Sequence, residues 1–230
     1  MKFLSPLGEG VLVKRYKRFM ADIKLPDGSE TTIHCPNTGS MATCGQPGDT
    51  ILYSDSMNPA RKLQWTWELT KTAKGYVGVN TSRTNRLVEE AFENQLIPSL
   101  SQFSELKREV KYGASRIDFC LIFDEKQCWI EVKNATLLHA GNVVFPDAVT
   151  SRGLKHLVEL QEIKKAGHRA VLFFVVNRSE GEKFSIADHI DGVYAKELKK
   201  AMKNGVEVMA WRTHADHQSI ELFEEVAVDL

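Results

Sequence analysis

Two carboxylates and a lysine near the middle of this 230-residue chain have the spacing of a metal-dependent phosphate site. Asp118 lies within one apolar run, and Glu131 and Lys133 lie at the end of the next. Charged groups are costly to bury unless they are paired or bind a metal. Mg²⁺ is usually held by one or two carboxylates together with waters and a phosphate. A lysine two residues from such a carboxylate can reach the same phosphate, or an attacking water, as a point charge.

The two apolar runs read as a β-hairpin whose turn lies at Asp124 and Glu125. In that register the charged residues form two opposed pairs on one face: Asp118 with Glu131, and Arg116 with Lys133. Because side chains alternate along a strand, the apolar residues share the other face: Ile117, Phe119, Leu121, Cys128, Ile130 and Val132. Two opposed carboxylates repel each other unless they hold a cation. A simpler interpretation stays open, in which both carboxylates only form salt bridges with the neighbouring Arg116 and Lys133.

The composition is that of a globular protein, with 43% hydrophobic and 26% charged residues and a net charge of zero. No apolar run approaches the ~20 residues of a membrane span, and Pro6 and Gly8 interrupt the start before a signal-peptide core could form. The four cysteines lack CxxC spacing, so we expect no zinc site and reduced thiols. These features predict a cytoplasmic protein.

Residues 1–81 are predicted to form an all-β domain. Short β-branched and aromatic segments alternate with turn sequences around Gly28 and Gly48, and residues 11–25 read as one long strand. About five short strands in this length favour a small barrel, with the OB-fold as the obvious candidate. One segment interleaves cations with aromatic rings, which suits phosphates and bases: Lys14, Arg15, Tyr16, Lys17, Arg18 and Phe19. An ordinary exposed strand explains the same segment equally well.

Residues 82–230 are predicted to form a mixed sheet flanked by helices. The first helix begins near Ser82 and ends before Pro98, and Glu89 lies at the edge of its apolar face, where it can reach a neighbouring site. A second helix runs from about Arg152, with His156 on the same side. The strand after it, residues 168–177, is apolar on both faces, as in a sheet covered by helices.

This order of helix, three strands, helix and strand, with Asp118 and Glu131-x-Lys133, resembles the PD-(D/E)xK nuclease superfamily. Three stretches narrow the resemblance: residues 37–41 (NTGSM), residues 131–134 (EVKN) and residues 145–157 (FPDAVTSRGLKHL). They are similar to the sugar fermentation stimulation protein A (SfsA) family, over nearly the whole chain. The fold class that follows is α/β (α+β), with an N-terminal OB-fold β-barrel and a PD-(D/E)xK nuclease-like mixed sheet.

The resemblance also implies roles for individual residues. Asp118 and Glu131 would be metal ligands, with the carbonyl of Val132 joining them, Lys133 would be the catalytic lysine, and Glu89 would be the acid of the first helix. Arg152 and His156 would face the site from the second helix and contact nucleic acid, together with the basic barrel segment that runs from Lys14 to Arg18. The expected cofactor is one or two Mg²⁺ or Mn²⁺ ions.

The function expected is DNA binding without sequence preference, with hydrolysis of phosphodiester bonds by a metal-dependent deoxyribonuclease. The family name also links such proteins to sugar metabolism in bacteria. An alternative is therefore a non-catalytic DNA-binding regulator of sugar (maltose-type) metabolism genes. A third is an RNA-processing nuclease, which an OB-fold also permits. A homodimer is compatible with the sequence.

Overall fold

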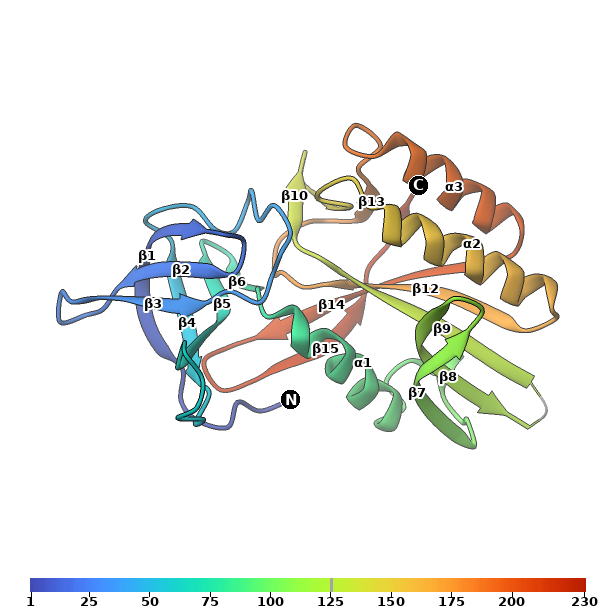
Figure 1. Ribbon diagram of the computed structural model, residues 1–230. Coiled ribbons are helices and arrows are strands. Elements are labelled where there is room, and N and C mark those ends of the chain that lie inside the picture. Colours follow the sequence, from blue (N-terminus) through green and yellow to red (C-terminus); the bar gives the residue numbers. More distant parts are fainter. Residues whose placement is uncertain (125) are drawn as a thin grey trace.

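The computed structural model describes residues 1–124 and 126–230, so that Glu125 of the expected hairpin turn lies outside the described residues. A β-barrel forms one end of the molecule and a helix-covered sheet forms the other (Figure 1). The barrel strands are β1 (Gly8–Tyr16), β2 (Met20–Lys24), β3 (Glu30–His34), β4 (Thr50–Asp55), β5 (Trp65–Thr72) and β6 (Gly75–Gly78).

The barrel closes with the connectivity of an OB-fold. β1 pairs with β2 and β4, β2 pairs with β3, and β5 pairs with β4 and β6, all in antiparallel fashion. A parallel contact between His34 of β3 and Thr66 of β5 completes the ring. The predicted turn at Gly28 forms as expected, because Gly28 takes a φ of +86° and Asp27 accepts a hydrogen bond from the Ser29 N–H.

The single long strand predicted for residues 11–25 is wrong. The chain reverses at Lys17 and Arg18, which have φ values of +50° and +65°, and returns as β2. The basic segment therefore lies at a hairpin tip, where Lys17, Arg18 and Phe19 are exposed. Two consecutive residues of positive φ are typical of tight hairpin turns, although Asn and Gly are the usual occupants. This stretch contains no Gly or Asn, so the turn could not be predicted from its residue types.

The second part of the chain is an α+β arrangement around a six-stranded mixed sheet of order β15-β14-β12-β9-β8-β7. The central strands β9, β12 and β14 run parallel, and the outer ones are antiparallel to their neighbours. The elements in chain order are η1 (Thr81–Arg83), α1 (Thr84–Glu93), η2 (Pro98–Leu100), β7 (Glu105–Tyr112), β8 (Ser115–Phe123), β9 (Lys126–Ala135), β10 (Leu137–His139), β11 (Asn142–Phe145), α2 (Ser151–Lys165), β12 (Arg169–Val176), β13 (Phe184–Ile186), α3 (Gly192–Lys203), β14 (Glu207–Ala215), β15 (Ile220–Glu225) and β16 (Val228–Asp229).

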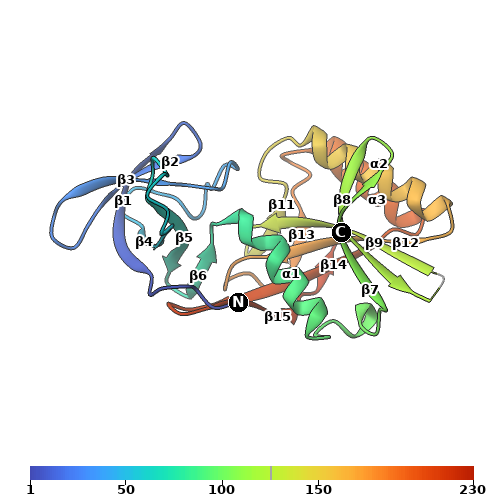
Figure 2. The same ribbon diagram turned by 60° about the horizontal axis from the view of Figure 1, so that its bottom comes forward.

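Helices cover both faces of this sheet (Figures 1 and 2). One core packs α1 against residues such as Phe119, Ile130 and Phe173. The other packs α2 and α3 against Trp129, Phe174 and their neighbours. β12 contributes alternate residues to the two cores and is buried throughout apart from Arg169, which confirms the doubly covered strand predicted from its sequence.

The starts of α2 and α3 are tied together by one buried carboxylate. Asp191 caps α3 by accepting the Tyr194 N–H, and its other oxygen accepts the Thr150 N–H at the start of α2. Thr150 in turn caps α2 through its hydroxyl, which accepts the Gly153 N–H. The two helix starts therefore hold a fixed position over the sheet.

Backbone hydrogen bonds join the barrel to the sheet. Gly78, at the end of β6, donates its N–H to the Asn177 carbonyl at 2.8 Å, and Ser179 donates to the Tyr76 carbonyl at 3.0 Å. Between them, the fully buried Arg178 donates to the Thr43 hydroxyl of the barrel and to the Thr136 carbonyl. β6 ends at Gly78 and α1 begins at Thr84, on either side of the domain boundary predicted between residues 81 and 82.

Among residues 1–124 and 126–230, no helix has the length and apolar character needed to cross a membrane. All four cysteines are buried free thiols, in agreement with the sequence. Burial raises the pKa of the Cys128 thiol to about 12, and Cys44 behaves in the same way, which keeps both thiols protonated.

The close approach of Gly78 to Asn177 gives a test of the junction. A Cβ added at Gly78 would lie 2.0 Å from Asn177 Oδ1. The Asn177 amide cannot yield, because it bonds to both Asn134 and Thr213. We expect Gly78→Ala to lower the free energy of unfolding in urea by about 2 kcal/mol, a typical cost of overpacking.

The matched control is Gly192→Ala at the first position of α3, where an added Cβ meets no atom within 4 Å. That change restricts the unfolded chain and should leave stability equal or slightly higher. An unfolding midpoint of Gly78→Ala at or above that of the parent would contradict the close packing at the junction.

Candidate active site at the divergence of two strands

The predicted carboxylates lie where β8 and β9 separate. The ladder between these strands has the predicted register and ends at the pair Phe119–Ile130. Beyond it, Asp118 Oδ2 accepts the Val132 N–H at 2.8 Å, so that a side chain replaces the missing main-chain acceptor. The strands therefore part at the two acidic residues.

Two details of the predicted hairpin are wrong. Ile117 lies in the core beneath α2 and α3, whereas Phe119 lies in the core beneath α1, so the strand changes face at Asp118. The neighbouring strand is irregular at the same level, where Glu109 has a φ of +50°. Arg116 is exposed and pairs with Lys111 of β7 instead of Lys133. This change of face could not be predicted, because Ile117 and Phe119 are both apolar and both buried.

Helix α1 holds Asp118 from the other side. Asn85 donates its side-chain N–H to Asp118 Oδ1 at 2.8 Å, so both carboxylate oxygens have a partner. Glu89, one turn further along α1, accepts a hydrogen bond from Arg108 of β7 at 3.0 Å. The structure thus brings Asn85 to the carboxylates, and it places Glu89 in an ion pair beside them. The sequence had marked Asn85 only as a neighbour of Glu89 on the helix.

Glu131 is buried and is held by two cationic or polar side chains from different elements. Lys133 Nζ lies 2.5 Å from Glu131 Oε1 and 3.1 Å from His156 Nδ1. His156, buried on α2, also contacts Glu131 Oε1 through Nδ1. Among the described residues, the second oxygen of Glu131, Oε2, is buried and has no hydrogen-bond partner. A buried carboxylate oxygen without a partner is a position where a cation or a water can bind.

The two carboxylates have opposite pKa shifts. Burial, followed by the negative charge of Glu131, raises the pKa of Asp118. Burial also opposes ionisation of Glu131, but the hydrogen bond from His156 and the charge of Lys133 outweigh it and lower the pKa of that carboxyl. Glu131 is therefore the stable anion of the pair, and Asp118 is the group whose ionisation is costly without a counter-ion.

These groups fit a hard divalent cation. Within the described ranges, no three His, Cys, Asp or Glu side chains gather as a metal cluster. The available donors are the two carboxylates and a main-chain carbonyl. Val132 donates its N–H toward Asp118, and the N–H and C=O of a strand residue point to the same side. Its carbonyl therefore points to the side of Asp118, and oxygen donors of this kind are those that Mg²⁺ and Ca²⁺ prefer.

Tyr194 is a neighbour that the sequence did not indicate. It lies on α3 with its hydroxyl buried and, among the described residues, unpaired. Burial, with smaller contributions from the charges of Glu131 and Asp191, raises the pKa of this phenol far above its ordinary value. Tyr194 is 63 positions from Glu131 in the chain, so no local motif could have linked them.

The basic barrel segment is only partly available for a ligand. The guanidinium of Arg15 donates to the carbonyls of Asn37, Gly39 and Arg18 at 2.7–3.0 Å, so it fixes a loop rather than pointing outward as expected. Two other side chains of the segment contact the Asp22 carboxylate of β2. Lys14 forms an ion pair with it at 3.4 Å, and the Tyr16 hydroxyl donates a hydrogen bond to it at 3.0 Å.

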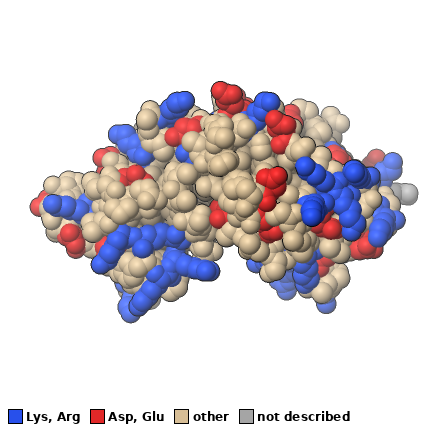
Figure 3. All heavy atoms as spheres, turned by 90° about the horizontal axis from the view of Figure 1, so that it is seen from above, with Lys and Arg blue, Asp and Glu red and all other residues tan. Residues whose placement is uncertain are grey.

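Lys14 is exposed but paired with Asp22, so the exposed cations of this segment without an ion pair among the described residues are Lys17 and Arg18 at the hairpin tip. On the sheet side, Arg152 is exposed in the first turn of α2, whereas His156 is buried against Glu131. Figure 3 shows lysine and arginine side chains gathered over both ends of the molecule, with a notch between them. The charge distribution thus has two basic areas separated by the junction of barrel and sheet.

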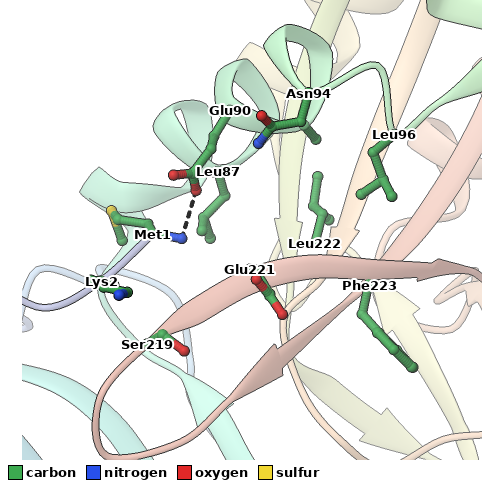
Figure 4. Close-up of a pocket in the computed structure, with 11 residues that line it drawn as sticks. Met1, Lys2, Leu87, Glu90, Asn94, Leu96, Ser219, Glu221, Leu222 and Phe223 are labelled. Carbon is green, nitrogen blue, oxygen red and sulfur yellow. Dashed lines mark ion pairs between the residues drawn. The ribbon is translucent and has the colours of Figure 1, made fainter.

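A larger cavity, of about 630 Å³, lies on the opposite flank of α1 (Figure 4). Leu87, Glu90 and Asn94 line it from the helix, and Phe223 lines it from β15. Glu90 is engaged there by the Met1 amino group at 2.6 Å. Neither Asp118 nor Glu131 lines this cavity. It is therefore separate from the candidate active site, although it is larger than the cavity at the junction of barrel and sheet.

Comparisons with known proteins agree with this architecture. A family model described as the sugar fermentation stimulation protein RE domain matches residues 82–219, and one described as the SfsA N-terminal OB domain matches residues 13–79. The solved structure of Pyrococcus furiosus SfsA in complex with Ca²⁺ covers 100% of this chain and 98% of its own, with a TM-score of 0.91 and 24% sequence identity. That likeness shows a shared fold.

The raised pKa of Asp118 has a measurable consequence for stability. A carboxyl group with a higher pKa in the folded state binds its proton more tightly there, so its ionisation costs stability at high pH and costs nothing in acid. In metal-free buffer with EDTA, we expect the free energy of unfolding of Asp118→Asn to gain on that of the parent as the pH rises to 8. The gain should shrink as the pH falls toward the unfolded value of about 3.9.

The control, Asp216→Asn, should behave in the opposite way. Asp216 accepts the N–H groups of Gln218 and Ser219 at 2.7 Å, and these bonds lower its pKa. Its substitution should therefore reduce stability at pH 8, with a smaller loss in acid. Urea titrations at pH 8 and in acid check the pair, and an Asp118→Asn variant whose stability relative to the parent does not rise with pH would refute the electrostatic assignment.

Proposed function

Because the chain belongs to the sugar fermentation stimulation protein (SfsA) family, we propose that it binds DNA and hydrolyses phosphodiester bonds with a divalent cation. The observation that carries this proposal is the buried Glu131 with its orphaned Oε2, beside Asp118 at the separation of β8 and β9. Burial and the neighbouring charge of Glu131 make ionisation of Asp118 costly without a cation, so the arrangement makes physical sense as a metal site.

The cation would be held by Asp118, Glu131 and the Val132 carbonyl. The structure of the Pyrococcus furiosus relative is a complex with Ca²⁺. Ca²⁺ and Mg²⁺ both take oxygen ligands, so this supports a hard-cation site here, with Mg²⁺ or Mn²⁺ as the ion for catalysis. When bound, such an ion polarises the scissile phosphate, activates a water and stabilises the leaving oxygen.

The other side chains of the site supply charge and positioning. Lys133 carries a positive charge next to Glu131, where it would offset charge on the attacked phosphate and orient the attacking water. His156 restrains both Glu131 and Lys133 from α2. Asn85 orients Asp118, and Glu89 with Arg108 forms the neighbouring ion pair.

DNA would lie across the notch between the two predicted domains, residues 1–81 and 82–230. Lys17, Arg18 and Arg152 are exposed on the two sides of this junction and would contact phosphates. Phosphate contacts carry no sequence information, so binding would be independent of sequence and would weaken with salt. The same contacts would serve a DNA-binding regulator without activity, which the following variants distinguish from a nuclease.

The first test compares plasmid and single-stranded DNA cleavage in Mg²⁺, Mn²⁺ and EDTA. We expect cutting with either metal and none with EDTA. Asp118→Ala removes a metal ligand and Lys133→Ala removes the positive charge, so each should lower the cleavage rate at least about 100-fold. DNA affinity should stay close to that of the parent, because neither residue lies on the basic surface.

Glu93→Ala is the matched control, since Glu93 is an exposed carboxylate at the end of α1 away from the site. It should cut at the parental rate. Binding without cutting in the parent, unchanged in all three variants, would favour the regulator and leave the carboxylates with a structural role.

The second test concerns the hairpin tip. Lys17→Ala with Arg18→Ala should weaken binding to any DNA sequence and should reduce the slope of log K against log salt by about 2, because each lost phosphate contact removes about 0.9. The paired control is Lys71→Ala with Lys74→Ala, two exposed lysines at the β5–β6 turn. Equal salt slopes for the two double variants would exclude the hairpin tip from the DNA contact.

A further inference from the structure

A second, smaller cavity lies at the junction of barrel and sheet, close to the carboxylates. Its volume is about 180 Å³. Residues 37–39 of the barrel line one side, and Asn134 at the end of β9, Phe145 and Thr150 line the other. Asn134 directly follows Lys133, and consecutive Cα atoms lie about 3.8 Å apart. The cavity is therefore next to the proposed reaction site.

The three sequence stretches that distinguish this chain from a generic nuclease core all reach this cavity. Residues 37–41 contribute the barrel loop, residues 131–134 contribute the end of β9, and residues 145–157 contribute the segment that leads into α2. The carboxylates themselves lie outside it. The distinctive residues are thus gathered where a ligand of the site would extend, rather than where the cation would bind.

The barrel loop that forms one wall is held in place by Asp147, which also lines the cavity, and by Arg15 of the barrel. Asp147 accepts the Ser40 N–H at 2.7 Å, and the Arg15 guanidinium donates hydrogen bonds to the carbonyls of Asn37 and Gly39. A Cβ on Gly39 would lie 2.2 Å from Asp147 Oδ2, so only glycine allows this approach. The wall is therefore preorganised, which reduces the entropic cost of binding.

Two amide nitrogens remain for a ligand. Asn37 Oδ1 accepts the Gly39 N–H, and Asn134 Oδ1 accepts hydrogen bonds from Thr84 and Asn177. Within the described residues, neither side-chain nitrogen has a partner, and neither is sealed from solvent. Each can therefore donate to a ligand in the cavity, and Phe145, whose ring packs against Phe174 and Tyr194, also lines it.

This combination matches one heterocyclic base. The volume is below the ~300 Å³ of small drug-binding pockets, which leaves room for a single planar ring system. Paired amide donors suit carbonyl and ring-nitrogen acceptors on a base edge, and bases taken out of a stack are commonly read by such hydrogen bonds with aromatic contacts.

We propose that this cavity receives one unpaired base of the nucleic acid whose phosphate lies at Asp118 and Glu131. The inference rests on the proposed function and extends it to a substrate class. A base within a duplex cannot enter without unpairing and unstacking, which costs a few kcal/mol. The protein therefore selects single strands, frayed ends or unpaired nucleotides over continuous duplex.

The test uses the exposed Thr38, whose side chain lines the cavity and makes no hydrogen bond among the described residues. Thr38→Trp fills the cavity with a bulky ring, whereas Thr38→Ala only trims it. Dissociation constants are measured in EDTA for a fluorescent single strand and for the blunt duplex of the same sequence. Melting temperatures confirm that both variants are folded.

We expect Thr38→Trp to bind the single strand at least tenfold more weakly than Thr38→Ala, with equal binding of the duplex. Equal binding of the single strand by both variants overturns the base pocket. Independently, the dinucleotide pTpT is titrated into the parent and followed by NMR. Shifts of the Asn37 and Asn134 side-chain amides support the pocket, and their absence at saturation overturns it.

The two proposals fail separately. A parent that binds pTpT through these amides but cuts no DNA in Mg²⁺ or Mn²⁺ overturns the nuclease and leaves the pocket. A parent that cuts single strands, with Thr38→Trp cutting as fast as Thr38→Ala, overturns the pocket and leaves the nuclease.

Discussion

The structure depends on one buried carboxylate. Glu131 lies in the central sheet with its Oε1 held by Lys133 and His156. Burying an ion of this kind requires compensation from charges and hydrogen bonds. The compensation comes from β9 itself and from α2, whose position over the sheet is fixed by the caps at Thr150 and Asp191. The placement of α2 and α3 is thus coupled to the ionised state of a single side chain.

Asp118 complements Glu131 by making the opening beside it. Its carboxylate takes the place of a main-chain acceptor for Val132, which allows β8 to leave β9 without an unsatisfied N–H. The same residue marks the point where the strand exchanges one core for the other. A local break in the ladder therefore brings the Asp118 carboxylate to the main chain of β9, one residue from Glu131.

Much of this could be predicted from the chain alone, because the signals were local. The hairpin register follows from two apolar runs around a polar turn, and β12 follows from its uninterrupted apolar sequence. The closed barrel and the two family matches also confirm predictions made from the sequence. The reversal at Lys17 and Arg18 was missed because neither residue is a usual occupant of a positive φ.

Other features could not be found by local signals at all. The role of Arg15 depends on a loop more than twenty residues away, and Tyr194 meets Glu131 only through the packing of α3. Asn85 was visible as a polar residue on α1, but its bond to Asp118 depends on how that helix lies on the sheet. Long-range packing decides which of several plausible polar residues reaches the site.

The junction at β6 has a mechanical consequence. Strand hydrogen bonds to residues 177 and 179, with the buried Arg178 between them, fasten the barrel to the sheet as an extension of the same backbone network. A hinge needs a segment that can change its backbone angles freely, and this connection has none of that freedom among its paired residues. A nucleic acid that binds across the notch must therefore adapt its own shape, because the two parts of the protein cannot rotate about this connection. A stiff duplex bound across the notch would then carry an elastic cost that a flexible strand does not, in addition to any cost of unpairing.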